Sequence, residues 1–193
     1  MPFHKVLVLA AHPDDEMGCA GTIAKLVGEG ASAHLLTFSE CSDLNGPELM
    51  DEYRAAVSLL GVSFESLNLP NRHLPEHRQT ILDHMLPGFD LVLTPATCDE
   101  HQDHATVTQE AIRAYKHTTI LGYELPLNAV RSSRMAAYVK VALEVKLDHA
   151  ELYASQAHKP YMDFRYIEGL ARMRGLQAGY EFAEAFEVIR WIM

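Results

Sequence analysis

The sequence of 193 residues predicts an α/β protein in which a mostly parallel β-sheet lies between two layers of helices. Short apolar runs alternate four times with segments of helical length, which is the pattern of parallel strand–helix units. Glycine or proline follows most of these segments and marks their ends. No linker, repeat or low-complexity stretch interrupts the chain, so we expect one domain over residues 1–193.

The first part of the chain shows the alternation most clearly. The run VLVLAA over residues 6–11 has the length and the β-branched content of a buried parallel strand. The next segment places its apolar residues on one helical face and ends near Gly30. The other strands expected in this part are 34–38, 64–69, 91–94 and 119–123, and the helices are 18–30, 48–60, 76–86 and 104–115.

Beyond Pro126 the pattern changes. A strand is expected over residues 135–141, followed by helices over 143–153 and 167–176. The segment FEVIRWI over residues 186–192 has the composition of a final strand. Because the regular alternation stops here, the position of these elements in the sheet is left open.

The composition argues against several classes of protein. The formal net charge is −10, whereas proteins that bind nucleic acids present basic surfaces, so we expect no nucleic-acid partner. No apolar run approaches the roughly 18 residues of a membrane span, and the N-terminus lacks the layout of a signal peptide. Three cysteines without a CxxC pair predict no disulfide framework. We therefore expect a cytoplasmic protein.

A group of ionisable residues follows the first expected strand directly. The sequence His-Pro-Asp-Asp-Glu occupies residues 12–16. Ligands of open α/β sheets bind outside the carboxyl ends of the strands, so these side chains lie where this fold places its chemistry. Three successive acids repel one another, and a divalent cation would relieve that repulsion.

An alternative interpretation of residues 12–16 is an acidic cap, in which Asp15 or Glu16 caps the helix that follows. His12 does not fit this alternative, because a histidine at the end of a strand adds nothing to a cap. A nucleotide loop is weakly supported, since neither GxGxxG nor GxxxxGK[ST] is present.

A second loop rich in metal-binding side chains follows the fourth expected strand. Residues 96–104 read ATCDEHQDH, and His101 and His104 can converge at a helix start because they are three residues apart. A catalytic zinc ion usually has three protein ligands and one open position. His12, Asp15 and one of these two histidines would supply that set, which leaves the other beside the metal or on the substrate.

Two alternatives remain for the second loop. Cys98, His101 and His104 could bind zinc together as a local structural cluster, although the acids of residues 14–16 would then lack a role. The two histidines could also be polar residues at a helix start without a ligand. Each loop alone is weak evidence, whereas two such loops at one edge of the same sheet are stronger evidence for a metal site.

Both loops together resemble a known family. AHPDDE over residues 11–16 resembles the signature of the LmbE/PIG-L family of zinc-dependent N-deacetylases, and HQDH over residues 101–104 resembles its second motif, HxDH. Residues 146–156 and 175–186 are similar to later and less specific stretches of bacterial members. The resemblance implies a Rossmann-like three-layer α/β/α fold, which agrees with the elements expected above.

The resemblance also implies the roles of the motif residues. His12, Asp15 and His104 would hold Zn²⁺ or another divalent cation. Asp14 would act as the general base, and His101 would help to stabilise the tetrahedral intermediate. No chemical step is assigned to Glu16, the last acid of the first motif.

The contacts to the substrate are the least specific part of the resemblance. Family members commonly carry an arginine three residues before a glutamate of the second helix; Glu52 matches the glutamate, but Leu49 stands at the position of the arginine. Other residues are expected near the substrate because they neighbour that helix position, follow the third strand or match the later stretch. They are Arg54, Asn71, Arg72, His73, Ser155 and Gln156.

The implied reaction is the hydrolysis of an N-acetyl group on an amino sugar or sugar conjugate, such as a nucleotide- or lipid-linked GlcNAc-type sugar. Family members are often trimers or hexamers, so the resemblance implies a homo-oligomer. Two other functions remain open. A metal-dependent phosphoesterase would favour more than one metal ion and cationic side chains, and a non-catalytic sugar- or nucleotide-binding module would keep only the fold.

Overall fold

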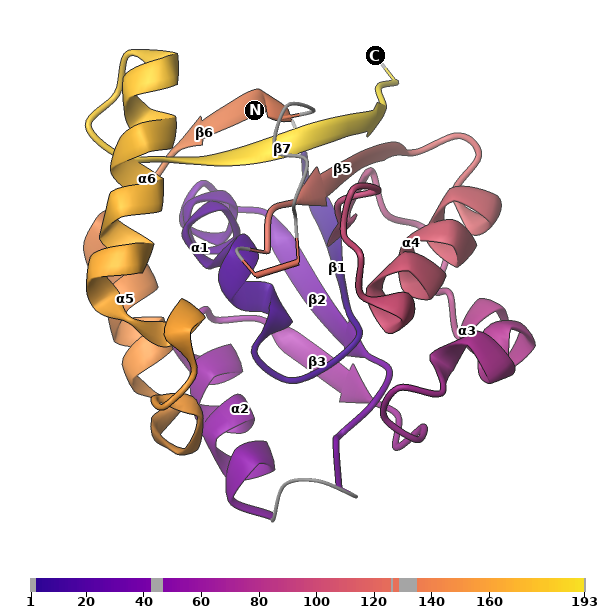
Figure 1. The fold of residues 1–193 in the computed structure, drawn as a ribbon. Helices are drawn as coiled ribbons and strands as arrows, with labels where there is room; N and C mark the ends of the chain where they lie inside the picture. Colours follow the sequence, from indigo (N-terminus) through magenta and orange to yellow (C-terminus); the bar gives the residue numbers. More distant parts are fainter. Residues whose placement is uncertain (1–2, 43–46, 126, 129–134, 193) are drawn as a thin grey trace.

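The structure is a computed structural model that describes residues 3–42, 47–125, 127–128 and 135–192. Its centre is a seven-stranded sheet in the order β3-β2-β1-β4-β5-β7-β6 (Figure 1). The strands are β1 (Lys5–Ala10), β2 (Ser32–Thr37), β3 (Ser63–Ser66), β4 (Leu91–Pro95), β5 (Thr119–Tyr123), β6 (Met135–Lys140) and β7 (Ala183–Arg190).

Helices connect these strands in the order that the sequence predicts. They are α1 (Ala20–Gly28), α2 (Pro47–Leu59), α3 (Arg78–Asp83), α4 (Gln102–Ala114), α5 (Leu143–Glu151) and α6 (Phe164–Ala178). Short 3-10 turns accompany them in the described ranges, namely η1 (Asp15–Gly18), η2 (Leu74–His77), η4 (Ala154–Gln156) and η5 (Pro160–Met162). The helix expected over 76–86 is divided into η2 and α3, and the last strand begins earlier than expected because Ala183 pairs with Lys140 of β6.

The prediction of a mostly parallel sheet is confirmed. The five strands β3, β2, β1, β4 and β5 are all parallel to one another. Strand β7 is antiparallel to both of its neighbours, β5 and β6. The change of pattern beyond Pro126 therefore corresponds to the antiparallel end of the sheet. Two helices, α5 and α6, follow β6 before the chain enters β7 antiparallel to it, so the repeated parallel strand–helix unit of the first part does not continue there.

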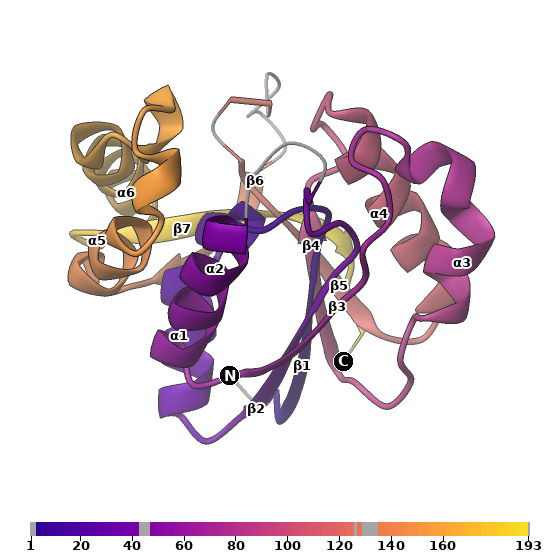
Figure 2. The same ribbon diagram turned by 90° about the horizontal axis from the view of Figure 1, so that it is seen from below.

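Two layers of helices cover the sheet. Figure 2 shows α1, α2, α5 and α6 on one side of the strands and α3 and α4 on the other. The side chains of β1 alternate between the two layers: Val6 and Val8 belong to the cluster under α1 and α2, and Leu7 and Leu9 to the cluster under α3 and α4. All four are fully buried, which explains why the strand reads as a continuous apolar run.

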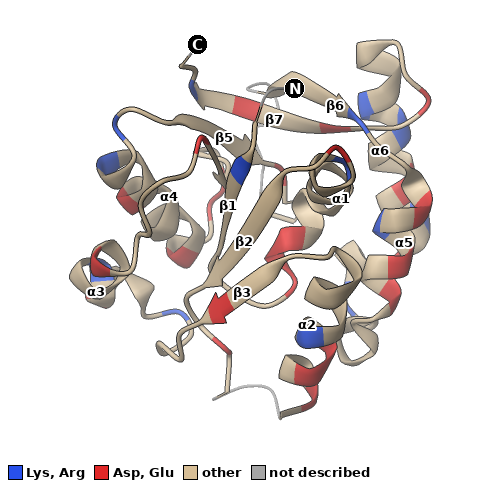
Figure 3. Cartoon of the chain, turned by 180° about the vertical axis from the view of Figure 1, so that it is seen from behind, with Lys and Arg blue, Asp and Glu red and all other residues tan. Residues whose placement is uncertain are grey.

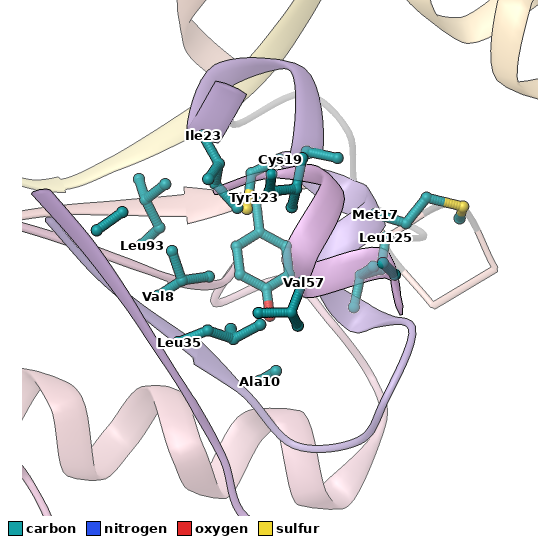
Figure 4. Packing of buried hydrophobic residues seen from close by; sticks show 14 of the residues in the cluster. Val8, Ala10, Met17, Cys19, Ile23, Leu35, Val57, Leu93, Tyr123 and Leu125 are labelled. Carbon is teal, nitrogen blue, oxygen red and sulfur yellow. The ribbon is translucent and has the colours of Figure 1, made fainter. Parts of the chain in front are cut away.

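Tyr123, the last residue of β5, anchors the core next to the first strand. Figure 4 shows its ring among Val8, Ile23 and Val57, which come from β1, α1 and α2. Its hydroxyl donates a hydrogen bond to the carbonyl of Leu9 at 2.8 Å, so the buried phenol has a partner. The contact fixes the carboxyl end of β1 against the end of β5.

The order of the strands opens a crevice at one edge of the sheet. β1 lies between β2 and β4, and the chain leaves β1 toward α1 on one face and β4 toward α4 on the other (Figures 1 and 2). Loops that leave neighbouring strands toward opposite faces diverge and leave space between them. The two donor-rich loops of the sequence are the loops that flank this crevice.

The helix that follows the first motif is capped from a distant part of the chain. The N-cap residue of α1, Cys19, makes no side-chain cap. Glu184 of β7 instead accepts hydrogen bonds from the backbone N–H groups of Gly21 at 2.9 Å and Thr22 at 2.7 Å, and Lys146 pairs with it. The alternative in which an acid of residues 12–16 caps this helix is therefore wrong.

Charged residues are distributed over the helices without a basic stripe on the visible face. Figure 3 shows acidic residues interspersed with basic ones on α2, α3, α4 and α6. Among the described residues, no helix combines the length and the hydropathy that crossing a membrane requires.

Two glycines of α6 provide a stability test of the packing. A Cβ atom at Gly175 would lie 2.5 Å from the carbonyl oxygen of Glu181, whereas one at Gly169 would meet nothing within 4 Å. We expect Gly175→Ala to lower the free energy of unfolding by about 1–3 kcal/mol, because the clash involves backbone. Gly169→Ala should raise it by about 0.5–1 kcal/mol through helix propensity. Thermal melting of both variants checks this; equal melting temperatures would contradict the close approach.

Candidate metal centre and catalytic site

Three potential metal ligands from the two motif loops meet in the crevice. Nδ1 of His12 lies 3.3 Å from Nε2 of His104, although the two residues are 92 positions apart. Oδ1 of Asp15 lies 3.3 Å from the same nitrogen of His104, and Oδ2 lies 3.7 Å from Nδ1 of His12. Each of the three side chains thus directs one ligand atom toward a common point.

The outer nitrogen of each histidine is held by a carboxylate. Nε2 of His12 lies 3.0 Å from Oδ2 of Asp103, and Nδ1 of His104 lies 2.9 Å from Oδ2 of Asp99. A neutral imidazole that donates its one N–H to such a carboxylate keeps a lone pair on its other nitrogen. In both histidines this second nitrogen faces the point where the ligand atoms converge. Carboxylates that orient histidines in this way are a regular feature of metal sites.

The carboxylate of Asp15 is fixed by the turn after β1. Its Oδ2 accepts hydrogen bonds from the backbone N–H groups of Ala11 at 2.9 Å and His12 at 2.8 Å. Burial would raise the pKa of Asp15, but the neighbouring His104 and His12 hold it below its usual value, so the group is a carboxylate. A ligand of this kind brings a full negative charge to the cluster.

The cluster as a whole favours a positive charge at its centre. Burial opposes a charge on His104, yet Asp15 and Asp99 on either side raise the pKa of its ring to about 10. A divalent cation would supply the same charge and leave the ring neutral. A tetrahedral ion with ligand bonds of about 2.1 Å separates its ligand atoms by about 3.4 Å, close to the distances found here. The donor set therefore fits such an ion.

His101 lies beside this cluster and defines a second possible group. Ring nitrogens of His12, His101 and His104 lie within 4.8 Å of one another, and the rings of His101 and His104 stack with centroids 4.4 Å apart. His101 is the N-cap of α4, and its Nδ1 accepts the backbone N–H of Asp103 at 3.2 Å. Burial and the two other histidines lower the pKa of His101, which favours a neutral ring.

The hydrogen bond at Nδ1 determines which nitrogen of His101 carries the proton. Because Nδ1 accepts the backbone N–H of Asp103, the neutral ring carries its hydrogen on Nε2. A protonated nitrogen can donate a hydrogen bond but cannot bind a metal ion. This geometry suits His101 as a donor next to the cluster, whereas His12 and His104 present lone pairs.

Asp14 occupies an unusual backbone conformation at the edge of the cluster. Its φ is 95°, in the left-handed region that non-glycine residues rarely adopt. Its carboxylate accepts a hydrogen bond from the hydroxyl of Tyr161 at 3.0 Å and lies 3.5 Å from Nζ of Lys159. Burial and the adjacent Asp15 raise the pKa of Asp14 to about 7, against the opposing effect of Lys159.

These residues line a cavity of about 460 Å³. Asp14, Asp15 and the three histidines form part of its wall. The other polar residues of the wall include Asn71, Arg72, Asn128, Lys159 and Tyr161, and its apolar residues include Met17, Leu49, Leu125, Leu127 and Pro160. The cavity is large enough for a small organic substrate. The potential metal ligands and the Asp14 carboxylate lie in its wall.

Two of the six residues expected near the substrate line the cavity and four do not. Asn71 and Arg72 belong to the wall. The side chain of Arg54 is more than half exposed and pairs with Asp51 at 2.8 Å, and His73 pairs at the surface with Glu76. Arg54 lies on α2 but is absent from the lining residues, so it does not take the place of the arginine that is missing at Leu49.

Ser155 and Gln156 have a different position from the one expected. Ser155 donates from its backbone N–H and its hydroxyl to the carboxylate of Glu52 at 2.7 and 2.6 Å, and Gln156 donates to the Ser155 hydroxyl at 2.8 Å. These bonds join the turn η4 to α2, and neither residue is among those that line the cavity. Their contacts are those of structural residues that hold two helical segments together.

Several residues of the site were not found by sequence reasoning. Asp99 lies five residues before His104, which is a local signal for their pairing, whereas Asp103 contacts His12 across 91 positions and gives no such signal. Lys159 and Tyr161 gave none, because they reach Asp14 from a turn about 147 positions later in the chain. The alternative zinc cluster with Cys98 is not supported: among the described residues, the group of potential ligands contains His12, His101 and His104.

Comparison with known proteins identifies a family model that matches this chain. The model of the family described as PIG-L, GlcNAc-PI de-N-acetylase, matches residues 7–115. The match begins in β1 and ends just after α4, so it contains both motif loops.

Solved structures share the fold over nearly the whole chain. A conserved protein, TT1542, from Thermus thermophilus is 23% identical, with a TM-score of 0.78 and coverage of 97% of this chain and 95% of that one. An N,N'-diacetylchitobiose deacetylase from Pyrococcus horikoshii is 20% identical, with a TM-score of 0.77 and coverage of 97% and 84%. A 4-carboxy-2-hydroxymuconate hydratase, GalB, from Pseudomonas putida is 18% identical, with a TM-score of 0.80 and 98% of both chains covered. At these identities the likeness establishes the fold, and the reaction has to be argued from the site.

Proposed function

The chain belongs to the PIG-L family, and on that premise we propose that it is a metal-dependent N-deacetylase that releases acetate from an N-acetylated amino sugar or sugar conjugate. The observation that carries the proposal is the convergence of His12, Asp15 and His104, with two inward-facing lone pairs and one carboxylate within 3.3–3.7 Å. An unligated carboxylate, Asp14, and a hydrogen-bond donor, His101, lie directly beside it.

The proposed ligands are His12, Asp15 and His104, and Zn²⁺ is the proposed ion. His101 is the less suitable ligand, because its Nδ1 already accepts a backbone N–H. When bound, such an ion supplies Lewis acidity toward an amide carbonyl and lowers the pKa of water to about 7.

Asp14 is the proposed general base. Its raised pKa, about 7, suits a group that first accepts a proton and later returns it. In amide hydrolysis Asp14 takes a proton from the attacking water and gives it to the nitrogen of the leaving amine. Tyr161 and Lys159 contact one carboxylate oxygen, Oδ2, and this orients the other oxygen for proton transfer.

His101 is the proposed donor to the carbonyl oxygen. Negative charge develops on that oxygen when water attacks the amide carbon, and the N–H at Nε2 of His101 is available to donate to it. Phosphoryl transfer relies mainly on metal ions and cationic side chains that neutralise the charge of the phosphoryl oxygens. Among the described residues, the cavity has only Arg72 and Lys159 as Arg or Lys side chains.

The cavity suits a sugar that has both polar and apolar faces. Asn71, Arg72 and Asn128 offer hydrogen bonds for hydroxyl groups, and Leu49 and Leu125 form an apolar wall for C–H faces. Leu49 is buried and carries no charge, so we assign no phosphate group of the substrate to the α2 side of the cavity. A cavity of about 460 Å³ lies within the range of volumes that bind small organic ligands.

Acetate release from a panel of N-acetyl sugars, with and without a zinc chelator, tests the proposal. We expect chelator-sensitive release that returns when Zn²⁺ is added back. Phosphoesters and unsaturated dicarboxylic acids, the latter chosen because a hydratase shares the fold, are assayed in parallel. Turnover of either of these with no release of acetate from the panel would overturn the proposed reaction.

His101→Ala is expected to retain the metal ion and to lower kcat by about 10²-fold, because one donor to the oxyanion is lost. The KM should change little, since the bond strengthens mainly in the transition state. Steady-state kinetics and elemental analysis check this prediction. The matched control is His73→Ala at the surface, and an unchanged kcat in His101→Ala would remove His101 from the mechanism.

A further inference from the structure

Glu16, the last acid of the first motif, has no step in the proposed reaction, yet it is fully buried. Its Oε2 accepts the backbone N–H of Asp14 at 3.2 Å. Its Oε1 accepts a hydrogen bond from the hydroxyl of Tyr153 and lies 3.2 Å from Nε2 of His149. A carboxylate is costly to bury without a function, so its contacts need an explanation.

The two anchoring residues are themselves fixed. Tyr153 and His149 are both fully buried, and their rings contact each other with centroids 5.5 Å apart. They come from α5 and the residues just after it, far from β1 in sequence. The position of Glu16 is therefore set by a helix that packs behind the site, rather than by the local turn alone.

The other carboxylate oxygen of Glu16, Oε2, contacts Asp14, whose backbone is strained. Asp14 has φ 95°, and such conformations persist in non-glycine residues only where the surroundings hold them. The hydrogen bond from the Asp14 N–H to Glu16 satisfies a buried backbone donor in that conformation. Glu16 does not line the cavity, so it cannot touch the substrate directly.

We propose that Glu16 is a positioning residue that transmits the fixed position of Tyr153 and His149 to the main chain of Asp14, and so keeps the Asp14 carboxylate directed into the cavity. The inference rests on the proposed function insofar as Asp14 is the base. It assigns a role to the part of the motif that neither metal binding nor proton transfer uses.

Two substitutions of similar size separate the hydrogen bond from the volume of the side chain. Glu16→Met removes both acceptor oxygens and keeps the length of the side chain. Glu16→Gln retains one oxygen for the Asp14 N–H, and its amide NH₂ can donate to the Tyr153 oxygen. Glu168→Met is the matched control, because it makes the same glutamate-to-methionine replacement at a partly exposed position of α6.

The first readout is hydrogen exchange of the Asp14 backbone amide by NMR, which needs no substrate. We expect Glu16→Met to exchange at least 10-fold faster at Asp14 than the wild type, and Glu16→Gln and Glu168→Met to remain within about threefold. Equal protection of the Asp14 amide in folded Glu16→Met protein would overturn the proposal.

The second readout is catalysis in two backgrounds. Glu16→Met should lower kcat by about 10²-fold with KM and metal content retained, because small displacements of a reacting group have effects of this size. Glu16→Gln should recover most of the loss. In an Asp14→Asn background, Glu16→Met should cost less than twofold further, since a residue that acts through Asp14 has nothing left to position. If Glu16→Met lowered kcat by the same factor in both backgrounds, its effect would be a general structural one, and the proposal would be overturned.

The outcomes separate this inference from the proposed function. If the wild type releases no acetate from any substrate, the proposed function fails while amide exchange still decides the role of Glu16. If Glu16→Met does not fold, Tyr153→Phe replaces it, because that change removes one anchor and leaves both oxygens of Glu16. Faster exchange at Asp14 in Tyr153→Phe is then expected, and unchanged exchange together with unchanged kcat would overturn the inference.

Discussion

Replacement of Asp14 by asparagine is expected to lower kcat by about 10³-fold while one metal ion per chain remains bound. Asparagine keeps the size of the side chain and can still accept the hydrogen bond from Tyr161, so the geometry of the turn is preserved. It cannot accept a proton from water or return one to the leaving amine. Acetate release and elemental analysis of the same preparation measure both quantities.

The control for this variant is Asp51→Asn, in which an acid on the surface of α2 undergoes the same change. This control should retain full turnover, because the Asp51 side chain is 79% exposed and lies outside the cavity wall. If Asp14→Asn turned over normally with a full metal site, another group would have to move the proton. A loss of the metal ion together with turnover would instead assign Asp14 to the ligand set.

Replacement of His104 by alanine is expected to weaken metal binding by more than 100-fold. Loss of an outer carboxylate that only orients a ligand weakens such sites by about 10–100-fold, and the loss of a ligand should exceed this. The variant also leaves the carboxylates of Asp15 and Asp99 without the ring between them, so repulsion adds to the lost bond. Competition with a chromogenic chelator measures the affinity.

His117→Ala is the control for His104→Ala, because His117 is neither in the cavity wall nor in either of the two sets of potential metal ligands described above. It should bind the ion as the wild type does. An unchanged metal content in His104→Ala would reject His104 as a ligand. The set of ligands would then have to be built from His12 and His101 instead.

The central arrangement could be predicted from sequence because it depends on a general property of parallel sheets. β1 and β4 are neighbours, and the loops at their carboxyl ends must emerge side by side. The sequence predicts that residues 12–16 and 101–104 lie at one edge of the same sheet, whereas the adjacency of β1 and β4 was not predicted and comes from the structure. The apolar runs that mark the two strands are short, continuous and fully buried, which makes them easy to recognise.

The parts that could not be predicted depend on contacts between distant segments. Glu184 caps α1 from 163 positions away, and Tyr161 reaches Asp14 from a turn that has no periodic pattern. The positions of Ser155 and Gln156 were expected from a family stretch, but no local pattern shows that Glu52 of α2 binds Ser155. Such pairs are determined by packing of helices, which one sequence does not reveal.

The walls and the reactive centre of the cavity come from different segments of the chain. The ligand atoms come from the loops after β1 and β4, whereas Leu49, Asn71 and Leu125 come from α2, the loop before η2 and the residues after β5. Exchange of these three side chains changes neither the proposed metal ligands nor the contacts of Asp14. The range of molecules accepted and the reaction performed on them can thus diverge independently during evolution, and an engineer can change the first without rebuilding the second.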